Sequence, residues 1–306
     1  MISEAERRGE LKEGGTVVEG TSGSTGISLA ALCCSKGYKC IIVMPDDQAQ
    51  EKVDLLQLFG AQVVKVKTAS IVNPQHYVNV ARKIASETER AVFMDQFETD
   101  ANFLAHWDNT GPEIWQQTEG KVQAFVMGAG TGGTLAGVSN YLKQRNPSVR
   151  VFLVDPPGSS LYHRVEHGVC YSPHQAERSL RKHRYDTIAE GIGLDRVTAN
   201  FAKAKIDRAL QVTDQEALNM AHFLLHREGL FVGCSSAMNC VGVVRAAREL
   251  GPGHTIATVL CDHGSRYMSR FWSRDYVERE CGLQWPQPNQ LEAIGLEALA
   301  LKGTLC

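Results

Sequence analysis

The chain has 306 residues, of which 43% are hydrophobic, so it can bury one large core or two ordinary ones. Its 32 lysines and arginines are balanced by 34 acidic residues, which argues against a dedicated nucleic-acid partner. No apolar run approaches the ~20 residues that cross a bilayer, the first ten residues are too charged for a secretory signal, and the nine cysteines form no CxxC pair, which indicates reduced thiols.

In chain order, short apolar strands alternate with helix-like runs. Strands are predicted at 16–19, 39–45, 61–66, 91–97, 122–128, 149–156, 230–233 and 255–262. Helices are predicted at 26–37, 48–60, 73–89, 111–120, 134–146, 214–229 and 236–250. Residues 158–186 interrupt this alternation as a polar excursion or flap, and a linker with a short helix is expected in the tail 286–306. The alternation predicts an α/β fold with a mostly parallel sheet covered on both faces.

The stretch 16–30, TVVEGTSGSTGISLA, combines a strand, a turn of small residues and the start of a helix. Free amides at a helix N-terminus and the helix dipole favour an anion there, and Ser22, Ser24 and Thr25 add hydroxyl donors. An ordinary capped turn, in which a hydroxyl only satisfies helix amides, explains this one loop equally well.

A second glycine loop follows the strand at 122–128. Gly128, Gly130 and Gly133 fit the dinucleotide pattern G-x-G-x-x-G, and Asp155 ends the next strand, so an NAD-binding oxidoreductase is one alternative. The additional residues Thr131, Gly132 and Thr134 suit the loop better to wrapping a single terminal phosphate.

A third cluster, GLFVGCSSAMN, places Ser235 and Ser236 where a short strand meets a helix. Either hydroxyl could cap the helix. Alternatively, a neutral serine could donate a hydrogen bond to a pyridine nitrogen without keeping that nitrogen protonated, which favours elimination chemistry.

The three loops together resemble the β-family of pyridoxal-phosphate enzymes, which includes cysteine synthase and cystathionine β-synthase. EGTSGSTGISLA resembles the substrate-carboxylate loop of that family and GAGTGGTLAG its cofactor-phosphate loop. HWDNTGPEIW, AEGIG, GLFVGCSSAMN and CDHGSRYMSRFW follow at family positions and in family order. The similarity runs from Glu4 to about Trp272 and is nearest to the fungal-type cysteine synthase-like branch.

The resemblance implies a three-layer α/β fold like that of the tryptophan-synthase β-subunit. It implies a smaller mobile domain at 18–115, which carries the substrate loop, and a larger cofactor-binding domain at 1–17 and 116–285. The implied residues for pyridoxal 5′-phosphate are Ser24, Gly130, Thr131, Gly132, Gly133, Thr134 and, facing the pyridine nitrogen, Ser236. The implied residues for an amino-acid substrate are Thr21, Ser22, Gly23, Thr25, Gln96 and Gly191.

The implied reaction replaces the β-substituent of a serine derivative, giving cysteine from O-acetylserine and sulfide, or cystathionine from serine and homocysteine. A homodimer in the cytoplasm or mitochondria is the corresponding expectation for the complete protein. One departure is Ser24, because most relatives have an asparagine there that bonds the cofactor's 3′-oxygen.

The second departure concerns the lysine that carries the cofactor as a Schiff base. In the family it lies roughly thirty residues before the position of Ser24, so we expect it before Met1, with part of the larger domain also missing. Lys12, Lys36 and Lys39 have the wrong context and are predicted to be solvated. A non-catalytic protein that keeps the cofactor pocket is therefore the main alternative to an active enzyme.

Two histidine pairs, His163 with His167 and His222 with His226, have helical spacing. Neither has the glutamate of the metalloprotease arrangement, so they are interpreted as polar helix faces and no metal site is predicted.

Overall fold

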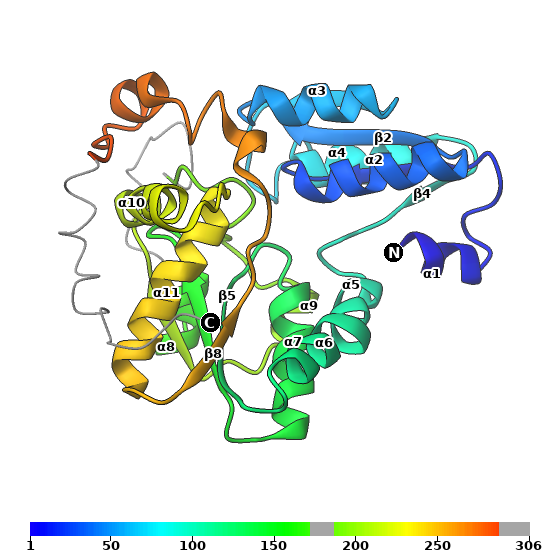
Figure 1. Cartoon of the computed structure of the whole chain (residues 1–306). Helices are drawn as coiled ribbons and strands as arrows, with labels where there is room; N and C mark the ends of the chain where they lie inside the picture. The colour runs from blue at the N-terminus through cyan, green and yellow to red at the C-terminus, as the bar shows by residue number, and fades with distance from the viewer. Residues whose placement is uncertain (172–186, 288–306) are drawn as a thin grey trace.

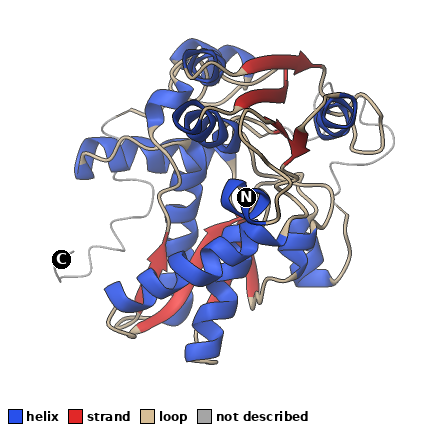
Figure 2. Ribbon diagram, turned by 90° about the vertical axis from the view of Figure 1, so that its right-hand side faces the viewer, coloured by secondary structure: helices blue, strands red, loops and turns tan. Residues whose placement is uncertain are grey.

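The computed structural model describes residues 1–171 and 187–287, and these form two four-stranded parallel sheets (Figure 1). The first sheet has the order β3-β2-β1-β4, with β1 at Thr16–Gly20, β2 at Lys39–Pro45, β3 at Gln62–Val66 and β4 at Ala91–Phe93. The second has the order β7-β6-β5-β8, with β5 at Val122–Gly128, β6 at Arg150–Asp155, β7 at Arg208–Gln211 and β8 at Thr255–Thr258. Figure 2 shows the two sheets as separate groups of strands, each flanked by helices.

Helices cover both sheets. Around the first sheet lie α1 (Ile2–Arg7), α2 (Ser24–Lys36), α3 (Gln50–Leu58) and α4 (Tyr77–Glu87). The chain then continues through α5 (Asp100–Ala105), the π-helical turn His106–Thr110 and α6 (Gly111–Gln117). Around the second sheet lie α7 (Gly133–Arg145), α8 (Leu161–His167), α9 (Ala199–Ala202), α10 (Asp214–Phe223) and α11 (Cys234–Leu250).

The strand period of two residues decides which helix covers which face of the first sheet. Val17 and Ile42 belong to the same core cluster as residues of α2 and α3. Val18 and Val43, one position later on the same strands, pack with Ala81 of α4 on the opposite face. The apolar run of each strand is therefore buried on both sides, as expected for a parallel sheet between helices.

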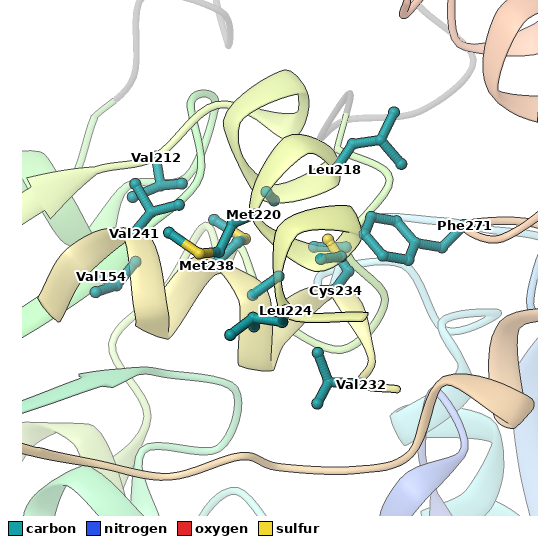
Figure 3. Close-up of a cluster of buried hydrophobic side chains, with 14 of the residues drawn as sticks. Val154, Val212, Leu218, Met220, Leu224, Val232, Cys234, Met238, Val241 and Phe271 are labelled. Atoms are coloured by element: carbon teal, nitrogen blue, oxygen red, sulfur yellow. The ribbon is translucent and has the colours of Figure 1, made fainter. Parts of the chain in front are cut away.

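The second sheet follows the same rule. Val154 of β6 packs against α10 and α11, through residues such as Leu218 and Met238 (Figure 3). Leu153, its neighbour on the strand, packs on the other face with Leu135 of α7. Each sheet together with its covering helices thus has three layers, which confirms the predicted three-layer α/β class. We call the first sheet with its helices the first unit and the second sheet with its helices the second unit.

Several predicted elements need correction. The predicted strand 230–233 is only an isolated antiparallel bridge between Val232 and His263, and the predicted strand 91–97 ends at Phe93. The segment 158–186 contains α8, so its start is helical, while 172–186 and the tail from 288 onward lie outside the described residues. Strand β7 was not predicted, because RALQ is short and carries a charged first residue.

The predicted assignment of residues 1–17 to the larger domain differs from their packing in the structure. Ile2, Ala5 and Leu11 are buried in the core cluster of the first sheet, together with Val17. This packing places residues 1–17 with the first sheet, whereas the resemblance implied that they belong to the larger domain. The boundary near residue 115 and the mobility of the smaller domain stay predictions.

Candidate active site

A cavity of about 200 Å³ lies where the carboxyl ends of β1 and β5, from different sheets, come together. The carboxyl edge of parallel strands is the usual place for ligands in α/β proteins. Eight predicted site residues line it: Thr21, Ser22, Ser24, Thr25, Gln96, Gly130, Thr131 and Gly191. Five others do not reach its wall: Gly23, Gly132, Gly133, Thr134 and Ser236.

The carboxylate loop, residues 21–25, joins β1 to α2. The Thr21 amide donates to the carbonyl of Val43 at 2.9 Å, and the Thr21 hydroxyl accepts from the Gly23 amide at 3.1 Å. Gly23 has φ +130°, a conformation that favours glycine, so the chain turns sharply into the helix. The first amides of α2 have no intrahelical partner and face this turn, which makes the loop suitable for a carboxylate.

Gln96 connects the carboxylate loop to the core of the first unit. Its Nε2 donates to the carbonyl of Gly20 at 2.7 Å and to Oε1 of Glu19 at 3.3 Å. Glu19 is fully buried, and this burial raises the pKa of its carboxyl to about 8, with the nearby charge of Asp95 adding to the effect. Gln96 is therefore held by the backbone and by a buried carboxyl group whose pKa is raised.

The phosphate loop, residues 129–134, joins β5 to α7. Here glycines are required by close approach: a Cβ on Gly130 would lie 2.5 Å from the carbonyl of Gly191, and one on Gly132, at φ +86°, would lie 2.6 Å from the backbone of Phe201. Thr131 is fixed by two short bonds, since its Oγ1 accepts from Asn102 at 2.9 Å and its carbonyl accepts from Thr198 at 2.7 Å. Contacts within the protein thus fix the backbone of this loop.

This loop fits a phosphate group. The amides of Gly130, Thr131 and Gly132 donate to no described residue, and they lie at the positive end of the 13-residue helix α7. A phosphate accepts such donors through several oxygens. Thr134, which was predicted to share this task, instead has its hydroxyl 3.1 Å from Nε2 of His106.

The two serines of α11 have different positions. Ser236 is fully buried, and its Oγ accepts the Cys261 amide at 2.8 Å. Ser235 lines the cavity, so it is the better placed of the two to face a ring. Asn239, one turn further along α11, donates to the carbonyl of Val259 at 2.9 Å and accepts the Gly128 amide at 2.7 Å, which ties the helix to the ends of β5 and β8.

The position of Asp155 argues against the alternative of an NAD-binding site. Asp155 is fully buried, accepts the Tyr162 amide at 2.7 Å and does not line the cavity. Burial raises the pKa of this carboxyl to about 7. It accepts an amide of the first turn of α8 and, being buried, is not available to a ribose hydroxyl.

Among the lysines that the structure describes, Lys52 is the one that lines the cavity. Lys12, Lys36 and Lys39 are exposed, as predicted. Lys52 is not among the predicted site residues, although its position gives a signal: with Ala49, Val53 and Leu56 it follows the 3–4 residue spacing of a buried helical stripe. Its side chain is only 1% exposed, and its Nζ lies 2.6 Å from Oε2 of Glu190.

The histidine pairs do not form a metal site. Over residues 1–171 and 187–287, no group of three or more metal-binding side chains comes together. His222 is buried, with its ring 5.0 Å from that of Trp272, so it belongs to the core and not to a polar face as predicted. Within the same ranges no helix has the length and apolarity needed to cross a bilayer.

Comparison with known proteins shows the family of the chain. The family profile described as "Pyridoxal-phosphate dependent enzyme" matches residues 1–262, so the chain belongs to that family. Cysteine synthase 2 of Schizosaccharomyces pombe is 50% identical over 291 residues, which cover 92% of this chain and 74% of the relative. A Saccharomyces cerevisiae cysteine synthase, whose name suggests a mitochondrial location, is 48% identical over 89% of this chain and 72% of its own.

A solved structure extends the agreement to the whole fold. The crystal structure of a hydrogen sulfide-producing enzyme from Fusobacterium nucleatum matches with a TM-score of 0.76 and 27% identity, over 87% of this chain and 84% of that chain. The resemblance to the fungal-type cysteine synthase branch is confirmed, and with it pyridoxal phosphate as the cofactor of the family.

Proposed function

We propose that the protein makes cysteine and acetate from O-acetylserine and sulfide. The observation that carries the proposal is the meeting of two different anion loops, 21–25 and 129–134, on one cavity. One loop suits a phosphate and the other a carboxylate, which are the two anions that a phosphorylated cofactor and an amino acid bring. Bound pyridoxal phosphate supplies an electron-withdrawing ring that stabilises negative charge at the substrate Cα while the β-substituent leaves.

The residues of this chain would then have separate tasks. The amides of Gly130 and Thr131 hold the phosphate, and the hydroxyl of Ser235 or Ser236 faces the pyridine nitrogen. Thr21, Ser22 and Thr25 hold the amino-acid carboxylate from the opposite side, and Gln96, whose Nε2 donates to Gly20 and Glu19, supports their loop. Closing of the first unit over the second excludes water, which protects a reactive product of elimination from hydrolysis.

The test is cysteine formation by purified protein supplied with pyridoxal phosphate, O-acetylserine and sulfide. Serine with homocysteine is the matched substrate pair, because it would give cystathionine by the same chemistry. Cysteine formation that depends on added cofactor is the expected result. Cystathionine formation alone would reassign the substrates, and the absence of both products would contradict an active enzyme.

A second candidate, a cofactor-binding protein without catalysis, is favoured by one observation. The single lysine on the described cavity wall, Lys52, is committed to an ion pair with Glu190 and is not free to attack a carbonyl. Borohydride treatment of the cofactor-loaded chain separates the two candidates. A pyridoxyl group fixed on a lysine peptide supports the enzyme, whereas reversible binding without fixation supports the second candidate.

We also propose that the protein works as a homodimer in the cytoplasm or mitochondria. Its similarity to the cysteine synthases supports this proposal, and sedimentation of the purified protein tests its oligomeric part.

A further inference from the structure

A buried ion pair lies behind the carboxylate loop. Lys52 of α3 belongs to the first unit, and Glu190 belongs to the segment between β6 and β7 of the second. Their side chains are 1% and 5% exposed, and Nζ lies 2.6 Å from Oε2. A buried pair of this kind often stabilises a fold no better than apolar residues of the same size, so its position is more informative than its strength.

The stem of Lys52 supports the loop backbone. A Cβ built on Gly23 would lie 2.5 Å from Cδ of Lys52, so the stem fills the space beside that glycine. The Nζ lies 3.4 Å from the carbonyl of Ser22 and 4.4 Å from the centre of the Tyr267 ring. One side chain of the first unit therefore rests against two consecutive residues of the loop while its ammonium is held by the second unit.

The charges around this pair favour an anion in the loop. Glu190 also faces the Arg270 guanidinium, whose Nε lies 3.2 Å from Oε1. One carboxylate is thus matched by two cations. Without Lys52, Glu190 and Arg270 would only balance each other, and the surplus positive charge beside a cavity that has to accept a carboxylate would be lost.

We propose that Lys52 is a positioning residue for the substrate-carboxylate loop, held in place across the two units by Glu190. It acts through the backbone of Ser22 and Gly23 and does not touch the substrate. The proposal rests on the proposed function, since it assumes that an amino-acid carboxylate binds at residues 21–25.

The test compares Lys52→Met, which keeps the stem and removes the charge, with Lys52→Arg, which restores a cation. Lys36→Met is the matched control, because Lys36 pairs with Glu6 at 2.9 Å on the exposed surface of the same unit. Three readouts are needed: affinity for pyridoxal phosphate, calorimetric affinity of the cofactor-loaded protein for L-serine, and hydrogen exchange of the 21–26 amides without ligand.

For Lys52→Met we expect L-serine affinity to fall at least about tenfold and loop exchange to rise by a similar factor, with cofactor affinity changed by less than about threefold. Lys52→Arg should recover part of the L-serine affinity, and Lys36→Met should change nothing. Adding Glu190→Gln to Lys52→Met should change L-serine affinity and loop exchange little further, because the two side chains act through the same ion pair.

Unchanged L-serine affinity and loop exchange in Lys52→Met would overturn the proposal and leave the pair a purely structural feature. Should Lys52→Met fail to fold, Glu190→Gln replaces it with loop exchange as the deciding measurement, because this change releases Lys52 but keeps its charge: faster exchange supports the proposal and unchanged exchange overturns it. Failure of the wild-type chain to bind cofactor or L-serine would contradict the proposed function instead, and loop exchange in the ligand-free variants would still decide the role of Lys52.

Discussion

The two loops that meet at the cavity are held in different ways. In the phosphate loop, Thr131 is fixed by bonds of 2.9 and 2.7 Å to Asn102 and Thr198, and glycines lie in direct contact with the backbone of neighbouring segments. In the carboxylate loop, the Thr21 amide donates to Val43 at 2.9 Å, but the contacts of the residues after Thr21 are longer. Ser24 donates to Asp262 at 3.4 Å, and Lys52 reaches the carbonyl of Ser22 at 3.4 Å.

This difference matches the order in which ligands are used. A cofactor stays bound through many turnovers, so a rigid, preformed phosphate site lowers the entropy cost of holding it. A substrate must enter and leave in every turnover, so its loop needs looser contacts that close on binding. The comparison predicts that changes to the phosphate loop act mainly on cofactor binding and stability, whereas changes near the carboxylate loop act on substrate binding and pH dependence.

The largest effect is expected for Gly132→Ala. The alanine would occupy a left-handed φ of +86° and would place its Cβ 2.6 Å from the Phe201 backbone, which cannot swing aside. We expect a loss of about 2–5 kcal/mol in the free energy of unfolding. Chemical denaturation measures this loss, and a cofactor titration should show a parallel loss of affinity.

Gly253→Ala is the control for the clash. Gly253 has nearly the same φ, +87°, but a Cβ at this position would meet no atom within 4 Å. The substitution should therefore cost only the conformational part, about 1 kcal/mol, with unchanged cofactor affinity. Equal losses in both variants would contradict the claim that close packing makes the phosphate loop rigid.

The second prediction concerns Asn102→Ala. Asn102 donates to Thr131 Oγ1 at 2.9 Å and to the Gln96 carbonyl at 2.8 Å, so it joins the phosphate loop to the first unit. Its removal should cost about 1–3 kcal/mol of stability. Cofactor affinity should fall about tenfold, corresponding to about 1.4 kcal/mol.

Asn79→Ala provides the comparison for Asn102→Ala. Asn79 donates to two backbone carbonyls, of Ile71 and Asn73, at 2.7 and 2.8 Å, but does not line the cavity. It should lose similar stability and no cofactor affinity. A cofactor titration in which both variants behave alike would contradict a specific role for Asn102.

Sequence reasoning located the loops because each has a local signal. A strand, a run of glycines and hydroxyls, and a helix start within about fifteen residues are compatible with an anion site or a capped turn. The resemblance of the three loops to the pyridoxal-phosphate family favoured the anion site, and both loops line the cavity. The alternation of strands and helices likewise predicted parallel three-layer architecture. These features depend on residues that are neighbours in the chain.

What sequence reasoning missed depends on contacts between distant segments. The pairing of Lys52 with Glu190 joins residues 138 positions apart, and Asn102 reaches Thr131 across 29. Ser235 and Ser236 are adjacent and chemically identical, so only the direction in which α11 presents them distinguishes the one on the cavity wall. The helical stripe that Lys52 shares with Val53 and Leu56 indicates burial, but it does not identify the distant segment that covers the lysine.

The third prediction tests the carboxylate side by pH. Glu19 has its pKa raised from 4.5 to about 8 by burial, so between these values the folded protein keeps a proton that the unfolded chain releases. Burial of Glu19 does not lower the free energy of unfolding below pH 4.5. The free energy of unfolding then falls as the pH rises to about 8, and the loss is constant above that pH. The slope is at most about 1.4 kcal/mol per pH unit.

Glu19→Gln removes this titration, so its stability should fall less steeply with pH than that of the wild type between about pH 5 and pH 8, as followed by urea denaturation at each pH. The mutant loses the long 3.3 Å hydrogen bond from the backbone N–H of Gln96 to Oε2 of Glu19, which lowers the free energy of unfolding by a small amount that does not depend on pH. Identical pH slopes for the two proteins would mean that Glu19 is ionised in the folded state, and Gln96 would then be held by a charge.

The smallest effect is expected from the two serines of α11. Ser236→Ala leaves the Cys261 amide without its 2.8 Å partner and should cost about 1 kcal/mol of stability, whereas Ser235→Ala should cost almost none. If Ser235 faces the cofactor ring, Ser235→Ala should still shift the absorbance of the bound cofactor, measured in the same samples. An absorbance shift found only in Ser236→Ala would instead indicate that Ser236 contacts the ring. The phosphate side of the cavity would then have to move when the cofactor binds, which would contradict the rigidity proposed for it.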